Sequence, residues 1–190
     1  LTALRDPDEM LSHHLVDCLA VVPPMRRVVT ALRLTQADGG LRVLDVGSGG
    51  CLPGGVLAAV EPTWQVRCVD TVAKKASFIR QVSAELGLRN LQGVHGRVEG
   101  LPSALGRFNV VTSRAFASLA DFTRLSQHAL AEPGVWMAMK GRQPDDEQAA
   151  CVGARQRGSR ERSHRRSADR RQRAALEHRA QQAGRGIEQQ

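Results

Sequence analysis

Residues 41–55, LRVLDVGSGGCLPGG, combine an acidic side chain with closely spaced glycines at Asp45, Gly47 and Gly49. Glycines in a turn between a strand and a helix let backbone N–H groups approach a ligand, because a side chain would block that approach. Dinucleotide-binding proteins show G-x-G-x-x-G in such a turn, but Leu52 occupies the third glycine position here. The spacing indicates a ligand-binding turn, although a purely structural tight turn would account for the same glycines.

The residues on either side of this turn predict the two elements that would position it. Leu41–Val46 is a short, mostly apolar run typical of a buried strand, and Val56–Val60 is typical of a helix. Strand, glycine turn and helix is the order in which α/β proteins build nucleotide sites. Class I methyltransferases carry an acidic residue followed by G-x-G in this turn, and Asp45 with Gly47 and Gly49 fits that pattern better than the dinucleotide pattern.

Strand-like and helix-like segments alternate through residues 39–141. We expect further strands at 65–70, 91–95, 108–113 and 135–139, and helices at 74–86 and 118–131. This alternation predicts an α/β protein with a mostly parallel sheet and helices on both faces.

Turn and cap residues set the expected limits of several elements. Residues 1–34 predict two helices, the first beginning at Asp6 and ending at Pro23–Pro24. Ser118 and Asp121 form the capping box of a later helix, and Pro133–Gly134 predict a turn before the last strand.

A glycine and four charged residues lie at or just past the carboxyl ends of the expected strands: Gly47, Asp70, Glu99, Arg114 and Lys140. In an open parallel sheet the ligand binds at that edge, so we expect these residues to lie around one site. The two carboxylate oxygens of Asp70 suit the two hydroxyls of a ribose, although a turn acid would look the same. Arg114 suits a ligand contact or, alternatively, a surface ion pair.

Composition limits the class of protein. Residues 1–150 hold 16 Lys and Arg against 15 Asp and Glu, whereas residues 151–190 hold 11 Arg against 4 acids, so the net charge of +8 belongs mainly to the last segment. The four cysteines contain no C-x-x-C pair, which indicates neither a zinc site nor a disulfide framework and favours a reducing cytoplasm. No segment is long and apolar enough to span a membrane, and we expect no metal.

The order and spacing of several motifs resemble the small-subunit rRNA methyltransferase G family, also called glucose-inhibited division protein B. The matching pieces, from Leu1 to about Ala150, are LTALRDPDEML, HLVDCLAV, LDVGSGGCLPG, VDTVAKKASFIRQV, GRVEGLP, FNVVTSRAFASL and MKG. The resemblance implies a Rossmann-like class I S-adenosyl-L-methionine-dependent methyltransferase that methylates N7 of guanine 527 in 16S rRNA. It implies a domain over residues 1–150, with N-terminal helices at 1–34 and a donor-binding core at 39–141.

The resemblance also implies which residues hold the methyl donor. Gly47 and Leu52 should contact it in the first loop, Val98 and Glu99 should lie beside the adenine, and Arg114 should close the site. Asp70 should hold the ribose. Lys74 and Lys75 suit rRNA phosphates or a solvated helix start, and Phe116 is the best placed base-stacking residue.

Two departures from the family pattern leave alternatives open. Cys51 stands where the family has Gly, so a positive φ there would be strained. The family continues past MKG with two more strands, whereas residues 151–190 are rich in Arg and predict a disordered, out-of-frame or diverged tail, or else an RNA-binding tail that folds on its target. The last strands are therefore expected to be missing, and a non-catalytic RNA-binding remnant is the main alternative, with a nicotinamide-dependent oxidoreductase less favoured.

The chemistry that the resemblance implies requires no general base, because guanine N7 has a lone pair and no proton to lose. We accordingly expect orientation of the base behind the donor methyl group, without a dedicated acid or base. The expected partner is the 16S rRNA of the small ribosomal subunit, and we expect a cytoplasmic monomer without membrane contact.

Overall fold

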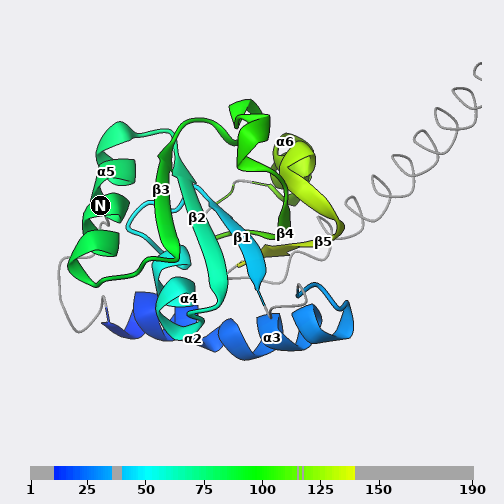
Figure 1. Ribbon diagram of the computed structural model, residues 1–190, viewed down its shortest axis with the longest axis horizontal. Coiled ribbons are helices and arrows are strands. Elements are labelled where there is room, and N and C mark those ends of the chain that lie inside the picture. The colour runs from blue at the N-terminus through cyan, green and yellow to red at the C-terminus, as the bar shows by residue number, and fades with distance from the viewer. Residues whose placement is uncertain (1–10, 36–39, 115, 117, 140–190) are drawn as a thin grey trace, which may run out of the picture. The chain divides into compact units, whose positions relative to one another are not determined.

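The computed structural model describes residues 11–35, 40–114, 116 and 118–139 of the chain (Figure 1). These residues lie within one compact unit, Leu1–Pro144. The strands are β1 (Leu41–Val46), β2 (Trp64–Asp70), β3 (Leu91–His95), β4 (Phe108–Ser113) and β5 (Leu130–Ala138). They form one sheet in the order β3-β2-β1-β4-β5, visible from left to right in Figure 1, and every neighbouring pair is parallel.

The helices of the described residues pack on both faces of this sheet. They are η1 (Leu11–Val16), α2 (Asp17–Ala20), α3 (Val22–Ala31), α4 (Gly54–Val60), α5 (Ala73–Glu85) and α6 (Leu119–Ser126), with short 3₁₀ turns η2 (Val98–Gly100), η3 (Ser103–Leu105) and η4 (Gln127–Ala129). One core joins α3, α4 and α5 to the sheet through side chains such as Met25, Leu57 and Ile79. A second core on the opposite face centres on Phe122 of α6 and Val98. The predicted parallel sheet with helices on both faces is confirmed.

Alternating side chains along each strand explain the two cores. Val43 and Val110 belong to the first core, whereas their chain neighbours Leu44 and Val111 belong to the second. Successive strand residues point to opposite faces, so a sheet that is buried on both sides needs apolar residues at consecutive positions. This requirement accounts for the consecutive apolar residues within the strands, such as Val43–Leu44 and Val110–Val111.

The two prolines near residue 23 were expected to end the first helix, and this expectation is wrong. The turn lies at Val21, and Pro23 and Pro24 occupy the first turn of α3 instead. A proline is tolerated there because the first N–H groups of a helix have no partner within the helix. The helix start expected at Asp6 lies outside the described residues.

The last strand also differs from its prediction. Pro133 and Gly134 lie inside β5 rather than in a turn before it, and the pairing with β4 shifts between Phe108 and Val110. Proline cannot donate to a strand neighbour, and an irregularity of this kind accommodates it.

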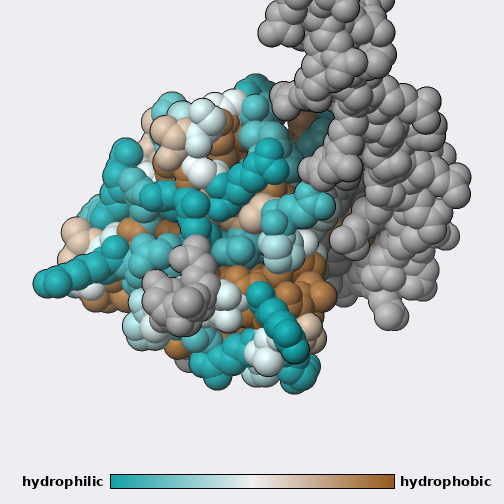
Figure 2. All heavy atoms as spheres, turned by 45° about the vertical axis from the view of Figure 1, so that its right-hand side comes forward, coloured by the Kyte–Doolittle hydropathy of each residue, from teal (hydrophilic) through white to brown (hydrophobic). Residues whose placement is uncertain are grey.

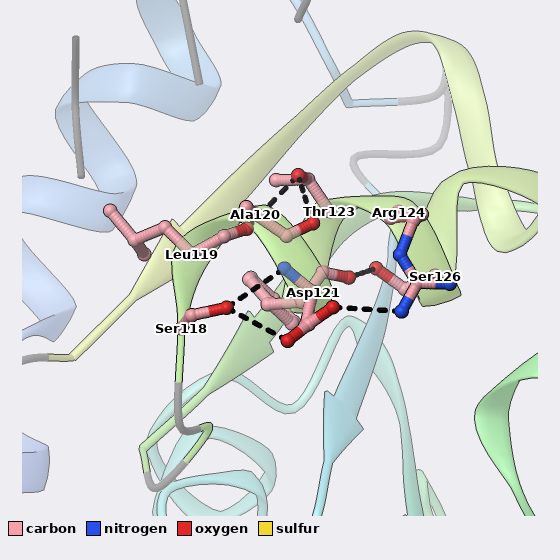
Figure 3. Close-up of polar contacts among 8 residues, drawn as sticks. Ser118, Leu119, Ala120, Asp121, Thr123, Arg124 and Ser126 are labelled. Atoms are coloured by element: carbon pink, nitrogen blue, oxygen red, sulfur yellow. Dashed lines mark hydrogen bonds and ion pairs between the residues drawn. The ribbon is translucent and has the colours of Figure 1, made fainter. Parts of the chain in front are cut away.

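Ser118 caps the start of α6 as predicted, although its reciprocal contact with Asp121 runs from the Ser118 hydroxyl to the carboxylate at 3.1 Å (Figure 3). The Ser118 hydroxyl accepts a hydrogen bond from the Asp121 N–H at 3.1 Å, and Asp121 also pairs with Arg124 at 2.7 Å. The helix ends at Ser126, earlier than the expected residue 131, and the Ser126 hydroxyl bonds back to the Phe122 carbonyl. Trp136 of β5 donates to that same hydroxyl at 2.9 Å, which ties the helix end to the sheet.

Apolar side chains also reach the surface. Figure 2 shows hydrophobic residues (brown) among hydrophilic ones (teal) on one face of the molecule. The exposed large apolar residues of the N-terminal helical segment are Leu15, Val16, Leu19 and Leu32. Within the described ranges, no helix has the length and apolar character needed to cross a membrane.

Candidate functional site

The glycine turn after β1 is tied to the end of β2. The N–H group of Gly47 donates to the Val69 carbonyl at 2.8 Å, and the N–H group of Gly49 donates to Asp70 Oδ2 at 3.0 Å. Gly47 and Gly49 have φ values of 73° and 53°, which other residues adopt only at a cost. The turn therefore needs its glycines for backbone conformation, and it lies against the carboxyl ends of two neighbouring strands.

Asp70 uses both of its carboxylate oxygens within the fold. Oδ2 accepts from Gly49, while Oδ1 accepts from the N–H group of Val72 at 2.9 Å, just before α5. The residue is only 6% exposed, yet it lines an adjacent cleft. Asp70 is thus both the turn acid considered from the sequence and a carboxylate at the edge of a cavity. Each of its oxygens has a second lone pair, which could accept a hydrogen bond from a ligand.

A cleft of about 470 Å³ opens at the carboxyl ends of β1, β2 and β3. Four of the predicted site residues line it: Gly47, Asp70, Val98 and Glu99. Its other lining residues are Val46, Val69, Thr71, Val72, Lys75, Gly96, Arg97, Phe116 and Leu125. A mostly apolar cavity with a few converging polar groups is the usual form of a small-molecule site.

The polar rim of this cleft carries both signs of charge. Arg97 and Glu99 form an exposed ion pair at 3.6 Å, and Lys75 also lines the cleft. Lys74 is exposed one position earlier on α5. Phe116 lines the cleft and contacts Phe122 with ring centroids 5.5 Å apart, whereas Lys140 lies outside the described residues.

Leu52 and Arg114 are not among the residues that line the cleft. Leu52 is half-buried in the glycine turn, where its N–H group donates to the Ser48 carbonyl at 3.1 Å. Arg114 makes a hydrogen bond of 2.6 Å with His14 Nδ1 and lies 3.8 Å from a carboxylate oxygen of Asp17. Arg114 therefore links the end of β4 to the N-terminal helical segment, as in the ion-pair alternative, and its contact with a ligand stays a prediction.

Asp45 and Gly54 have packing roles that were not predicted from the sequence. Asp45 is fully buried, and its Oδ2 accepts from the N–H group of Gly54 at 3.0 Å, at the start of α4. A Cβ at Gly54 would lie 2.2 Å from Cys68 Sγ and 2.9 Å from Asp45 Oδ2, so only glycine allows α4 to approach β1 and β2 this closely. Gly54 thus performs the close packing that the third glycine provides in dinucleotide turns, two positions later than Leu52. The Pro-Gly-Gly sequence after the turn was the available signal.

Burial changes the acidity of Asp45. Desolvation raises the pKa of its carboxyl from 3.8 to about 6, against the opposing effect of the hydrogen bond from Gly54. Its Oδ1 has no hydrogen-bond partner in the described part of the chain. The carboxylate therefore fixes the start of α4 at a cost in free energy when it is ionised.

Cys51 adopts the strained conformation that the sequence comparison suggested. Its φ is 70°, a region that favours glycine, and its side chain is buried against Gly55. Left-handed backbone costs a non-glycine residue about 1 kcal/mol or more.

We expect Cys51→Gly to be more stable than Cys51→Ala by about 1 kcal/mol in the free energy of unfolding measured by urea denaturation. Both variants remove the buried thiol, but only glycine also removes the backbone strain. The alanine variant is therefore the matched control for lost packing. An alanine variant as stable as the glycine variant would show that the turn has adapted to a side chain at this position.

The described residues contain no group of three or more His, Cys, Asp and Glu side chains that could hold a metal ion. The three described cysteines, Cys18, Cys51 and Cys68, are buried and unpaired by disulfides. Burial raises the pKa of the Cys18 thiol to about 11, in spite of the nearby Arg114. Cys18 is thus a neutral packing residue at neutral pH.

Comparison with known proteins decides the family. A family model described as rRNA small subunit methyltransferase G matches residues 1–174. This chain belongs to that family. The resemblance found in the sequence motifs is thereby confirmed.

Individual relatives agree with this assignment. The chain is 60% identical over 151 residues to the ribosomal RNA small subunit methyltransferase G of Acidovorax sp. (strain JS42), and the match covers 79% of this chain and 66% of that protein. It is 57% identical over 153 residues to the protein of the same name from Albidiferax ferrireducens, covering 79% and 67%. The chain thus spans about two thirds of the length of these relatives.

Solved structures show a more distant likeness. One is a SAM-dependent methyltransferase from Geobacter sulfurreducens in complex with S-adenosyl-L-homocysteine, at 21% identity and a TM-score of 0.48, covering 62% of this chain and 47% of that one. Membership of the methyltransferase G family, together with the observed sheet, confirms the Rossmann-like class I methyltransferase fold. The expected loss of the last strands concerns residues outside the described ranges.

Proposed function

We propose that this chain transfers a methyl group from S-adenosyl-L-methionine to N7 of guanine 527 in 16S rRNA. The observation that carries the proposal is the match to the methyltransferase G family over residues 1–174. The cleft at the carboxyl ends of β1 to β3, lined by four of the residues predicted for the donor, supports it. The proposed setting is a monomer acting on the small ribosomal subunit in the cytoplasm.

In this proposal, different residues of the cleft contact different parts of the methyl donor. Asp70 accepts hydrogen bonds from the ribose hydroxyls with the lone pairs that Gly49 and Val72 leave available. Val98 packs against the adenine and Glu99 lies at its edge, since both line the cleft and belong to the single turn η2. The bare backbone of Gly47 lets the sulfonium end of the donor approach the turn, and Leu52 is proposed to contact the donor from the same loop.

The chemistry needs positioning more than proton transfer. Methyl transfer from a sulfonium is an in-line displacement, and guanine N7 attacks with a lone pair that carries no proton. The site therefore has to hold N7 behind the methyl carbon and tolerate the positive charge that passes to the base. Arg114, held at the end of β4 by His14 and Asp17, is proposed to close the site on the donor side.

The decisive experiment is calorimetric titration of S-adenosyl-L-methionine into the 190-residue protein, followed by transfer of labelled methyl groups to small subunits that lack the modification. We expect saturable donor binding and one methyl group per subunit, at guanine N7. Donor binding without transfer would identify a non-catalytic remnant of the family. Binding of NADH with no binding of the methyl donor would favour the oxidoreductase alternative instead.

A further inference from the structure

One face of the sheet carries polar side chains at the amino-terminal ends of three strands. In the described residues, the connection from β3 to β4 contains only the single-turn helices η2 and η3, where a doubly wound sheet usually places a longer helix. Val46 and Val69, at the other end of this face, are covered by the second core. Positions two or four residues earlier on β1 and β2 share their face because side chains alternate along a strand.

The polar positions on this face form one group, which we call the arginine–glutamine face: Arg42, Gln65, Arg67 and Gln92. In the strand register Arg42 is opposite Gln65, and Arg67 is opposite Gln92. Gln65 and Gln92 are exposed, and the two arginines are half-buried. None of the four side chains is a carboxylate, so the face presents positive charge and amide groups.

The two arginines are held in place by their neighbours. Arg42 donates to the Leu105 carbonyl of η3, and its guanidinium lies 5.2 Å from the centroid of the Phe108 ring. Arg67 Nε donates to Gln92 Oε1 at 2.8 Å. Because the Gln92 carbonyl oxygen accepts this bond, its amide N–H₂ group remains as a donor beside the Arg67 guanidinium.

Like charges lie close together on this face. Partial burial and, secondly, the positive charge of Arg42 lower the pKa of Arg67. A pair of fixed cations gains free energy when an anion comes between them, since the anion relieves their repulsion and receives charge-assisted hydrogen bonds. Guanidinium and amide groups that offer N–H donors suit the oxygens of a phosphodiester.

We propose that the arginine–glutamine face binds the phosphate backbone of RNA. This inference rests on the proposed function, because it takes rRNA as the substrate. The face lies at the amino ends of the strands, roughly 15 Å along β1 from the cleft at the carboxyl ends, so it contacts RNA away from the reacting base. Such contacts position the substrate without reading its sequence.

The test compares Arg67→Glu with Arg80→Glu in the full chain. Both variants replace an arginine by a glutamate and therefore change the net charge equally. Arg80 is the control for position, because it is exposed on α5, which packs on the opposite face of the sheet. Affinity is measured by fluorescence anisotropy with a labelled 16S rRNA fragment that contains the target guanine and with an unrelated RNA of equal length, over a series of salt concentrations. Calorimetry with S-adenosyl-L-methionine and urea unfolding are run on the same samples.

We expect Arg67→Glu to weaken binding of both RNAs about tenfold at low salt and to reduce the slope of log affinity against log salt by about one. Arg80→Glu should stay within about twofold of the unchanged protein, and donor affinity should be the same in all three. An equal loss in both variants would overturn the proposal, as would RNA affinities of Arg67→Glu that match those of the unchanged protein. Failure of the unchanged protein to bind S-adenosyl-L-methionine would instead count against the proposed function, and the RNA comparison would still stand.

Discussion

Asp45→Asn is expected to gain about 2 kcal/mol of stability relative to the unchanged protein as the pH rises from about 4 to 7. The carboxyl of Asp45 is fully buried, and its pKa in the folded protein is raised from 3.8 to about 6. The folded state therefore binds this proton more tightly than the unfolded state does. The contribution of Asp45 to stability is complete below its unfolded pKa and is lost as the pH rises through the folded pKa.

The amide of the asparagine variant keeps the hydrogen bond from the Gly54 N–H and has no charge to desolvate. Urea denaturation of both proteins at several pH values measures the difference in free energy of unfolding. Any cost of packing the amide is independent of pH, so the change in that difference isolates the carboxylate. A difference that stays constant between pH 4 and 7 would mean that the folded protein leaves the acidity of Asp45 unchanged.

The strands were predictable from the sequence because the residue types along each segment, and the turn residues that bound it, indicate a strand without knowledge of distant contacts. β1, β3 and β4 match the predicted ranges, since each carries buried apolar residues and is bounded by polar or glycine residues. Element ends that depend on tertiary contacts were not predictable. α6 ends at Ser126, where Trp136 bonds to the serine hydroxyl, and Pro133 enters β5 through an irregular pairing with β4.

In the candidate site, too, the features set by local sequence were predictable and those set by tertiary contacts were not. Gly47, Asp70 and Glu99 were predictable because each lies at or just past the end of a strand, and a parallel sheet brings the carboxyl ends of its strands together. Val98, which lines the same cleft, was implied only by the family resemblance. Arg114 also follows a strand, but its side chain meets His14, which is 100 positions earlier in the chain. No local pattern in the sequence encodes such a contact.

The burial of Asp45 depends on packing across several elements. Asp45 is enclosed because α4 packs closely on β2 at Gly54. A Cβ at that position would collide with Cys68 Sγ. The sequence showed Asp45 as the acid of a ligand-binding turn, and the structure gives it the task of holding α4 at its start. A pattern of residue types identified the turn, whereas the role of each member came from its neighbours in space.

Asp70→Ala is expected to weaken the binding of S-adenosyl-L-methionine by about 1–3 kcal/mol, or roughly fivefold to 150-fold. The alanine variant removes the acceptors for the N–H groups of Gly49 and Val72 and also the proposed partner of the ribose. Glu85→Ala is the matched control, because Glu85 is an exposed acid at the far end of α5. Calorimetric titration of all three proteins provides the comparison.

A donor-product analogue separates the two roles of Asp70. In the unchanged protein, S-adenosyl-L-homocysteine should bind about tenfold more tightly than its 2′-deoxy analogue, because the analogue lacks one hydrogen bond to the carboxylate. In Asp70→Ala the two compounds should bind equally, since the partner of the hydroxyl is absent. If the preference for the 2′-hydroxyl survives in the variant, Asp70 only holds the glycine turn in place and another residue recognises the ribose. Loss of the preference in Asp70→Ala would be a non-additive result, and it would assign the 2′-hydroxyl contact to Asp70. The comparison is direct because it measures the same hydroxyl with and without the carboxylate.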